Sequence, residues 1–313
     1  MGTDNAYQAP PKIVVIGGSN RDIISRIHSE TADFETSHQG TISQHDGGVA
    51  RNIAEVLGRL EISVSLITVF GDDDISNEMM THLNDKNVDL THAIITSNMR
   101  SDIFIAVHDH KGEMIASVNQ MVLVKAITPT HIQSKANLIE QAEFVICDGN
   151  LDEETLVKIA SLNRKGKLVI DAVSTSKALK LRRLLAEIDI LKLSRSEGLA
   201  LCNLDNNSSV KNIIMSLYEK GVKQILVSDG ARGFMINSRD KIHHFSAIES
   251  SPQTVTGAGD CLLSGYLYGL FRGHSVVHAC ELGRHTAYLS TRSVSAVNDY
   301  IYPDNINEVC NPK

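Results

Sequence analysis

The sequence predicts an α/β fold in three layers, α/β/α, with a mostly parallel central sheet. Short apolar runs recur along the 313 residues, and segments with helical periodicity separate most of them. Strands that are apolar along their whole length are typical of parallel sheets, because helices cover both faces of such sheets. The alternation of such strands with helices therefore predicts one main α/β domain.

The expected elements follow in order along the chain. Strands are expected at residues 12–18, 64–69, 144–147, 168–170, 188–191 and 224–227. Helices are expected between most of these strands, at residues 49–60, 153–162 and 210–220. The polar residues 1–11 predict a flexible tail, which leaves residues 12–313 as the domain. Polar residues and glycines follow several strands, and they should meet at the carboxyl edge of the sheet. They are Gly17, Asp148, Asp171, Ser194, Ser228 and Gly257.

Two stretches interrupt this alternation and together predict a small β lid. Residues 21–44 are polar with little helical period, whereas Ile103, Ile105 and Val107 alternate with other residues in the second stretch. Residues 109–112, Asp-His-Lys-Gly, are typical of a hairpin turn. The lid segments are expected at about 21–46 and about 98–120. The alternative is a pair of surface hairpins without a role.

Composition and charge argue against several classes of function. The formal net charge is −7 without a dense block of Lys and Arg, so nucleic-acid binding through a basic face is not expected. No apolar run approaches the length of a membrane span, and the polar first residues lack the features of a signal peptide. The five cysteines are scattered, which is typical of reduced thiols and favours a cytoplasmic protein.

Residues 254–260, Thr-Val-Thr-Gly-Ala-Gly-Asp, carry the most informative chemical signal. Gly257 and Gly259 allow a tight turn, and the apolar run behind Asp260 predicts a helix whose N-terminus attracts anions. An anion cradle with a carboxylate at its rim suits phosphoryl transfer, in which donors absorb charge and the carboxylate takes a hydroxyl proton. Taken alone, the motif fits a helix start capped by Asp260 equally well.

This cradle is the last of four motifs that occur in a set order. The others are residues 17–22, Gly-Gly-Ser-Asn-Arg-Asp; residues 46–54, in which Gly47 and Gly48 open a helix; and residues 228–233, Ser-Asp-Gly-Ala-Arg-Gly. The set resembles the PfkB (ribokinase-like) family of carbohydrate and nucleoside kinases, from about residue 13 to about residue 289. The resemblance implies a ribokinase-like fold and a kinase that uses ATP and Mg²⁺. Residues 47–54, 112–114, 119–121, 147–150 and 171–174 with Lys177 resemble the pseudouridine kinases of that family.

The resemblance also implies roles for individual residues. Asp260 would be the base that activates the acceptor hydroxyl, and the N–H groups of Gly257, Ala258 and Gly259 would hold the transferring phosphoryl group. The acceptor-binding residues implied in the same way are Asn20, Asp22, Gly47, Gly48, Asn52, Ser174 and Lys177.

Ordinary structural explanations stand beside several of these acceptor-site roles. Asn20 and Asp22 also suit an Asx turn, and Asn52 also suits an ordinary helix position. Lys177 fits either a donor to a uracil carbonyl or a solvated lysine at a helix start.

Nucleotide contacts are implied after the later strands. The residues concerned are Ser194, Glu197, Ser228, Gly230, Gly233 and Thr256, and Glu197 would help to hold Mg²⁺ through water. Ser194 stands where the family usually has Asn, and Thr254 where it often has Asp. A neutral Thr254 cannot supply charge, which argues against a monovalent-cation site. A plain β-turn is the alternative for residues 228–233.

The favoured hypothesis is ATP-dependent phosphorylation of the 5′-hydroxyl of a ribonucleoside, with pseudouridine as the substrate. The alternatives are a kinase for ribose, a hexose or adenosine, and a catalytically silent ligand-binding protein on the same scaffold. Aromatic residues make up only 4% of the chain, which leaves Tyr7, Phe34 and Phe104 as candidates to stack on a base. The apolar positions of the lid, Ile103 among them, could also form a homodimer contact.

Overall fold

The computed structural model describes residues 12–31, 33, 35–238 and 241–307. The predicted tail, residues 1–11, lies outside the described residues, as do Tyr7, Phe34 and Cys310. The central strands are β1 (Ile13–Ile16), β4 (Val64–Ile67), β6 (Val88–Asp89), β10 (Phe144–Asp148), β11 (Lys167–Asp171), β12 (Ile190–Ser194), β13 (Gln224–Ser228), β14 (Phe234–Ser238) and β15 (Lys241–Phe245).

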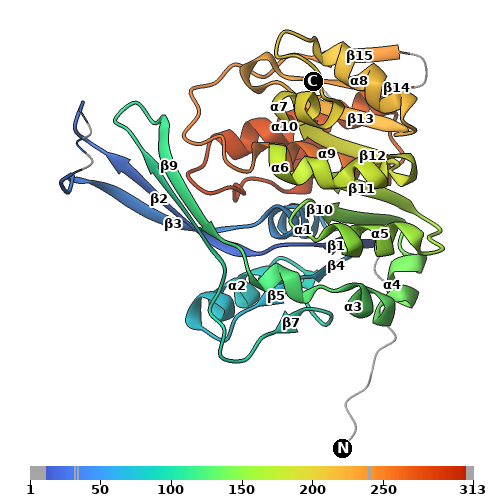
Figure 1. Ribbon diagram of the computed structural model, residues 1–313, viewed down its shortest axis with the longest axis horizontal. Helices are drawn as coiled ribbons and strands as arrows, with labels where there is room; N and C mark the ends of the chain where they lie inside the picture. The colour runs from blue at the N-terminus through green and yellow to red at the C-terminus, as the bar shows by residue number, and fades with distance from the viewer. Residues whose placement is uncertain (1–11, 32, 34, 239–240, 308–313) are drawn as a thin grey trace, which may run out of the picture.

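These nine strands form one sheet in the order β15-β14-β13-β12-β11-β10-β1-β4-β6 (Figure 1). The seven strands from β13 to β6 in this order are parallel, and β14 and β15 add antiparallel pairs at one edge. The predicted α/β fold with a mostly parallel sheet is therefore confirmed.

Helices cover both faces of the sheet, as the wholly apolar strands predict. In β1 the side chains of Val14 and Ile16 belong to one buried cluster, and those of Ile13 and Val15 belong to the other. One cluster includes residues of α3 (Pro129–Ser134), α4 (Ala136–Gln141), α5 (Glu153–Ser161), α6 (Thr175–Ala178), α7 (Arg195–Cys202) and α8 (Val210–Glu219). The other includes residues of α1 (Val49–Arg59), α2 (Asp74–Asp85), α9 (Ala258–Phe271), α10 (Val276–Thr291) and α11 (Pro303–Asn307).

Short 3₁₀ helices complete the connections, at η1 (Leu123–Ala126), η2 (Leu179–Arg183), η3 (Leu185–Glu187) and η4 (Gly230–Arg232). The apolar run at residues 64–69 does not form one strand, as expected, but divides at Thr68 into β4 and β5 (Val69–Phe70). The side chain of Thr68 is buried and shares a hydrogen bond of 2.9 Å with Ser19 Oγ, while β5 pairs with β7 (Ile94–Ile95). The hydrogen bond between Thr68 and Ser19 and the pairing of β5 with β7 thus end strand β4 at Ile67.

The lid is a separate four-stranded sheet, as predicted, and it projects away from the three layers (Figure 1). Its strands are β2 (Asn20–Ile27), β3 (Gly40–Gly47), β8 (Ile103–His108) and β9 (Met114–Gln120), in the order β3-β2-β8-β9. The β8–β9 turn contains Gly112 at φ 87°, as the sequence pattern predicts. The two hairpins join through a parallel pairing of β2 with β8, whereas the sequence indicates only antiparallel elements.

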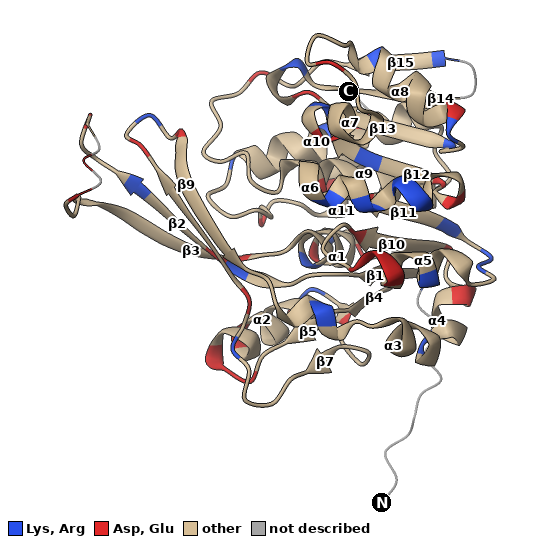
Figure 2. Ribbon diagram, viewed as in Figure 1, with Lys and Arg blue, Asp and Glu red and all other residues tan. Residues whose placement is uncertain are grey.

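Figure 2 shows Lys and Arg dispersed among Asp and Glu over the described part of the ribbon. No helix within the described ranges has the length and apolar character needed to cross a bilayer.

Candidate active site

Three charged side chains form a row at the carboxyl edge of the sheet. Asp148 ends β10, Asp171 ends β11, and Lys192 lies in β12; the register pairs Asp148 with Asp171 and Asp171 with Lys192. All three are buried. Buried charges are stable only when they are paired or accept several hydrogen bonds, so this row marks a region built for polar chemistry.

Asp148 ties three segments together beneath the predicted acceptor site. Its carboxylate accepts hydrogen bonds from the N–H groups of Gly18 (3.0 Å), Ala50 (3.1 Å) and Asn150 (2.9 Å). A Cβ on Gly17 would lie 2.5 Å from this carboxylate, so glycine is required there. Burial raises the pKa of Asp148, although the three N–H donors favour its charged form. Asp148 thereby positions the β1–β2 connection relative to the start of α1.

The predicted anion cradle lies at the start of α9. Gly257 is the N-cap residue at φ 79°, a conformation that suits glycine, and a Cβ there would lie 2.5 Å from the carbonyl oxygen of Ala296. The N–H of Ala258 bonds to Val255 O at 3.3 Å, so this predicted donor is already engaged. The first turn of a helix leaves N–H groups without helical partners, which fits Gly257 and Gly259 to the role that the resemblance implies.

Asp260, in the first turn of α9, is buried and accepts a hydrogen bond of 2.7 Å from Asn52 Nδ2 on α1. Burial and the nearby Asp171 carboxylate raise the pKa of Asp260 to about 7, against the opposing effects of Lys192 and the Asn52 bond. A general base works best when its pKa lies near the operating pH. Asp260 thus has the burial, the partner and the pKa that suit a base.

Lys192 lies under the cradle. Its Nζ contacts Asp171 Oδ2 at 2.9 Å, and a Cβ on Gly259 would lie 2.5 Å from the same nitrogen. Burial alone would lower the pKa of Lys192, but the charges of Asp171, Asp260 and Glu197 outweigh burial and raise it. The ammonium is therefore charged throughout the physiological range, and it places a fixed positive charge beside the predicted phosphoryl site.

The structure brings together four of the residues predicted to bind the acceptor, Asn20, Asp22, Gly47 and Gly48. Asn20 Nδ2 donates to Asp22 Oδ1 at 2.6 Å, and a Cβ on Gly47 would lie 2.4 Å from Asp22 Oδ2. Gly48, at φ 101°, lies close to the backbone of Gly18. A Cβ added to Gly48 would lie 2.4 Å from the carbonyl oxygen of Gly18. Burial raises the pKa of Asp22 to about 6, while the Asn20 bond and Arg51 oppose the shift.

A cavity of about 170 Å³ separates the lid from the loops before α9 and after α10. Asp22 and His45 of the lid line it, together with Thr254 and Thr256. The predicted acceptor residue Asp22 and the predicted nucleotide residue Thr256 therefore face the same space, although they are far apart in the sequence.

The predicted nucleotide residues gather at neighbouring strand ends. Ser194 and Ser228 are register partners at the ends of β12 and β13. Ser194 caps α7, and Glu197 completes the capping box by accepting from Ser194 N at 2.8 Å. Gly230 at φ 58° and Gly233 at φ 91° form the turn after β13. Ser194, the departure from the family pattern, thus has a structural role as a helix cap.

Lys177 lies near Asp148, which is beneath the predicted acceptor site. Lys177 Nζ donates to Asn150 Oδ1, and Asn150 is in turn held by Asp148. Burial lowers the pKa of Lys177. Ser174 is the N-cap residue of α6, directly after Val173, whose φ of 66° is strained for a β-branched residue.

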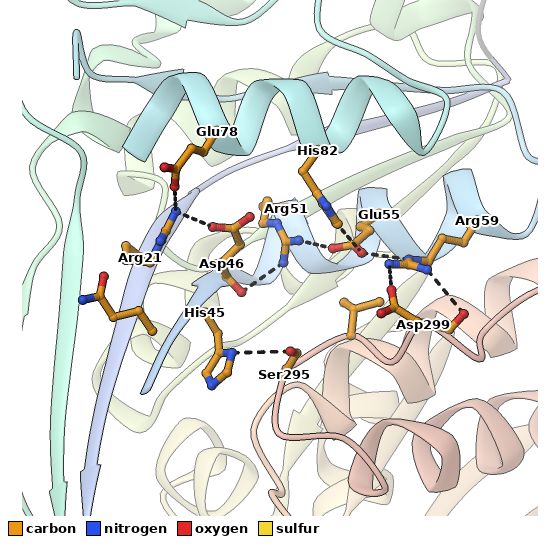
Figure 3. A pocket seen from close by; sticks show the side chains of 12 residues that line it. Arg21, His45, Asp46, Arg51, Glu55, Arg59, Glu78, His82, Ser295 and Asp299 are labelled. Carbon is orange, nitrogen blue, oxygen red and sulfur yellow. Dashed lines mark hydrogen bonds and ion pairs between the residues drawn. The ribbon is translucent and has the colours of Figure 1, made fainter. Parts of the chain in front are cut away.

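Two residues of α1, Arg51 and Glu55, were not predicted from the sequence to contribute to the site. Arg51 contacts Asn52, and Glu55 contacts Arg51. Arg51 and Glu55 form a buried ion pair that faces a cavity of about 400 Å³ between the lid base, α1 and α2 (Figure 3). Lys192 was missed as well. The available signal was a charge within an apolar pattern: Lys192 stands between Leu191 and Leu193, and Arg51 and Glu55 are four residues apart among apolar neighbours.

Within the described ranges, no three His, Cys, Asp or Glu side chains form a group that could hold a metal ion by themselves. Glu197 lies close enough to Lys192 to influence its pKa, as do Asp171 and Asp260. Mg²⁺ is commonly held by one or two carboxylates together with waters and substrate phosphates, so a single carboxylate such as Glu197 fits the predicted role.

Comparison with known proteins identifies the family of this chain. Residues 10–301 match the model of the pfkB family of carbohydrate kinases. The chain belongs to this family. It is 28% identical over 256 residues to a pseudouridine kinase of Escherichia coli K12, a match that covers 81% of this chain and 82% of that protein.

Solved structures agree on the fold of this pfkB kinase. A Thermotoga maritima ribokinase matches with a TM-score of 0.83 at 18% identity, covering 96% of this chain and 99% of the other. A putative E. coli ribokinase II in complex with ATP and Mg²⁺ matches with a TM-score of 0.82 at 16% identity, covering 97% and 100%. The chain is thus a sugar or nucleoside kinase of the pfkB family, a phosphotransferase with an alcohol as acceptor.

Proposed function

We propose that this kinase transfers the γ-phosphoryl group of ATP to the 5′-hydroxyl of pseudouridine. The observation that carries the proposal is the position of Asp260, buried at the start of α9 and bonded to Asn52 at 2.7 Å. The similarity to the E. coli pseudouridine kinase supports this acceptor.

In the proposed reaction, the 5′-oxygen of the nucleoside attacks the γ-phosphorus of ATP. An O–P bond forms, the bond from the γ-phosphorus to the β,γ-bridging oxygen breaks, and ADP leaves. The hydroxyl proton passes to a carboxylate oxygen of Asp260, while the N–H groups of Gly257 and Gly259 stabilise the charge on the moving phosphoryl group. The fixed charge of Lys192 acts in the same direction as these donors.

Mg²⁺ would neutralise the phosphates during transfer, and Glu197 is the residue proposed to hold it through water. One Glu197 oxygen accepts from Ser194 N, so the carboxylate has a fixed orientation at the start of α7. Ser194, Ser228, Gly230, Gly233 and Thr256 are proposed to contact the nucleotide.

Two features support a nucleoside rather than a free sugar. Lys177 and Asn150 form a hydrogen-bonded pair whose amide and ammonium groups suit the carbonyl and N–H groups of a uracil ring. Phe104 of β8 is the register partner of Asp22 in β2, and an aromatic residue next to Asp22 supports stacking on a base.

A substrate panel tests the acceptor. ADP release is measured with pseudouridine, uridine, adenosine, ribose and fructose, and pseudouridine should give the highest kcat/KM. Strong turnover of ribose or adenosine without turnover of pseudouridine would contradict the proposed substrate. ATP binding without phosphoryl transfer to any compound of a broad panel would instead identify a silent ligand-binding member of the fold.

Asp260→Ala tests the base. This variant should lose at least about a hundredfold in kcat while it still binds nucleoside, because proton transfer by a positioned base contributes about that much or more. Asp205→Asn, at an exposed position, is the matched control and should retain full activity. Near-normal turnover of the Asp260 variant would exclude this mechanism.

We also propose that the lid pairs with the lid of a second copy of this chain. Ile42, Ile105 and Val118 lie on one face of the lid sheet and are 72%, 40% and 68% exposed. The double variant Ile42→Asp/Val118→Asp should be monomeric by analytical ultracentrifugation, whereas Met215→Asp on α8 should leave a dimer intact. A monomeric wild-type protein would refute the pairing.

A further inference from the structure

The amide of Asn52 joins the active site to the interior of α1. Its Nδ2 donates to Asp260 Oδ2 at 2.7 Å, and its Oδ1 accepts from Arg51 Nη1 at 2.6 Å. Both ends of one amide are therefore used, one toward the proposed base and the other toward a guanidinium. Asn52 and Arg51 are each 3% exposed, so water does not compete for these bonds.

The chemistry of the two partners determines which end of the amide faces the base. A guanidinium can only donate hydrogen bonds, and an ionised carboxylate can only accept them. Rotating the Asn52 amide by half a turn would set its oxygen against Asp260 and its NH₂ group against Arg51, and both contacts would become repulsive. Arg51 thus holds the Asn52 donor on Oδ2 of Asp260, so that this bond does not occupy the other carboxylate oxygen.

Further contacts with Glu55 and Asp46 hold the guanidinium of Arg51 in place (Figure 3). Its guanidinium forms the ion pair with Glu55 and donates to the carbonyl oxygen of Asp46 at 3.1 Å. Glu55 also contacts Arg59 Nε at 2.8 Å and His82 Nε2 at 2.9 Å. Burial would raise the pKa of Glu55, but Arg51, His82 and Arg59 together lower it to about 2. Glu55 therefore stays ionised and keeps Arg51 in place.

We propose that Arg51 is a positioning residue for phosphoryl transfer, which acts through Asn52 to orient the carboxylate of Asp260. This inference rests on the proposed function of Asp260 as the base. It assigns to α1 a second role besides acceptor binding: the helix supplies an internal support, Glu55–Arg51–Asn52, for the reacting group on α9.

The pH profile provides a readout that a loss of stability alone would not change. The Asn52 bond favours ionised Asp260. Asp148, Asp171 and Lys192 face Asp260 from β10, β11 and β12, and they remain in every variant. Releasing the Asn52 amide should therefore raise the pKa of Asp260, move the acidic limb of kcat/KM to higher pH, and lower kcat by about tenfold, since charged hydrogen bonds are worth that much.

Arg51→Met removes the support, and Arg59→Met is the matched control. Both variants remove one arginine partner of Glu55, but of these two arginines only Arg51 donates a hydrogen bond to Asn52 within the described residues. In Arg51→Met the acidic limb of kcat/KM should move to higher pH and kcat should fall. In Arg59→Met neither change is expected. Arg51→Lys, which keeps a charge for Glu55, should fold like the wild type and show an intermediate shift. Because the effect passes through Asn52, Arg51→Met/Asn52→Leu should be no slower than Asn52→Leu.

A measurement without turnover separates this inference from the proposed function. The side-chain NH₂ resonances of Asn52, assigned by their absence in Asn52→Leu, should titrate with Asp260 in ¹⁵N spectra. Arg51→Met and Arg51→Lys should shift that midpoint upward, and Arg59→Met should not. An unshifted midpoint in Arg51→Met, or equal shifts in the two methionine variants, would overturn the role of Arg51. The same holds if the wild type phosphorylates its substrate and Arg51→Met shows an unchanged pH profile. A wild type inactive on the whole panel would overturn the proposed function instead.

Discussion

Replacing Asp260 with Asn should stabilise the protein at pH 8 while it abolishes catalysis. In the folded protein the pKa of Asp260 is raised from 3.8 to about 7, chiefly by burial and by Asp171. Below pH 3.8 the carboxyl group of Asp260 is protonated in both the folded and the unfolded protein. Between the two values the unfolded chain ionises first, so the folded state loses stability as the pH rises. Above the higher value the full penalty remains.

The size of the effect follows from the shift. One pKa unit corresponds to about 1.4 kcal/mol, so the penalty is about 1.5 kcal/mol at pH 5 and about 4 kcal/mol at pH 8. Asparagine carries no charge and can still accept from Asn52 Nδ2. The stability advantage of Asp260→Asn should therefore widen by about 2–3 kcal/mol between pH 5 and pH 8.

The assay is urea unfolding of both proteins across this pH range, with thermal unfolding as a second measure. Asp109→Asn is the control, because the backbone N–H groups of its turn lower the pKa of Asp109. Above the ordinary pKa of an aspartate, Asp109 is therefore ionised in both the folded and the unfolded protein. The free energy of unfolding of Asp109→Asn should thus differ from that of the wild type by the same amount at pH 5 and pH 8. An Asp260→Asn advantage that is independent of pH, or a loss of stability that grows toward pH 8, would show that the pKa of Asp260 is not raised in the folded protein.

Three further substitutions test the surrounding structure. Gly257→Ala should lower kcat by at least about tenfold in an ADP-release assay, because its Cβ would lie 2.5 Å from the backbone oxygen of Ala296; Gly112→Ala, also at positive φ but with open space around it, should leave kcat unchanged. Glu197→Gln should keep the helix cap, and so its melting temperature, while it raises severalfold the Mg²⁺ concentration that gives half-maximal rate; an unchanged Mg²⁺ requirement would remove Glu197 from that role. Val173→Gly should relieve a φ of 66° and stabilise the fold by about 1 kcal/mol, and a lower melting temperature would show that no strain is stored there.

Local sequence patterns determined much of the fold. The apolar runs predict the central parallel strands because strands buried on both faces need apolar side chains throughout. The turn at Gly112 and the positive φ at Gly257 follow from residue types that favour such backbone. The division of the run at Thr68 and the parallel pairing of β2 with β8 were not predictable, because each depends on which distant segment supplies a hydrogen-bonding partner.

The candidate site divides in the same way. The sequence alone determined which groups are available: a carboxylate behind a glycine turn, amides and carboxylates after the first strand, and the order of the four motifs. The hydrogen bond from Asn52 to Asp260, across 208 residues, depends on tertiary packing, and so do the contacts of Arg51 with Asn52 and of Lys192 with Asp171. The physical reason is that the charge state and orientation of a side chain depend on its burial and its partners. Both arise from long-range packing, which no local pattern specifies.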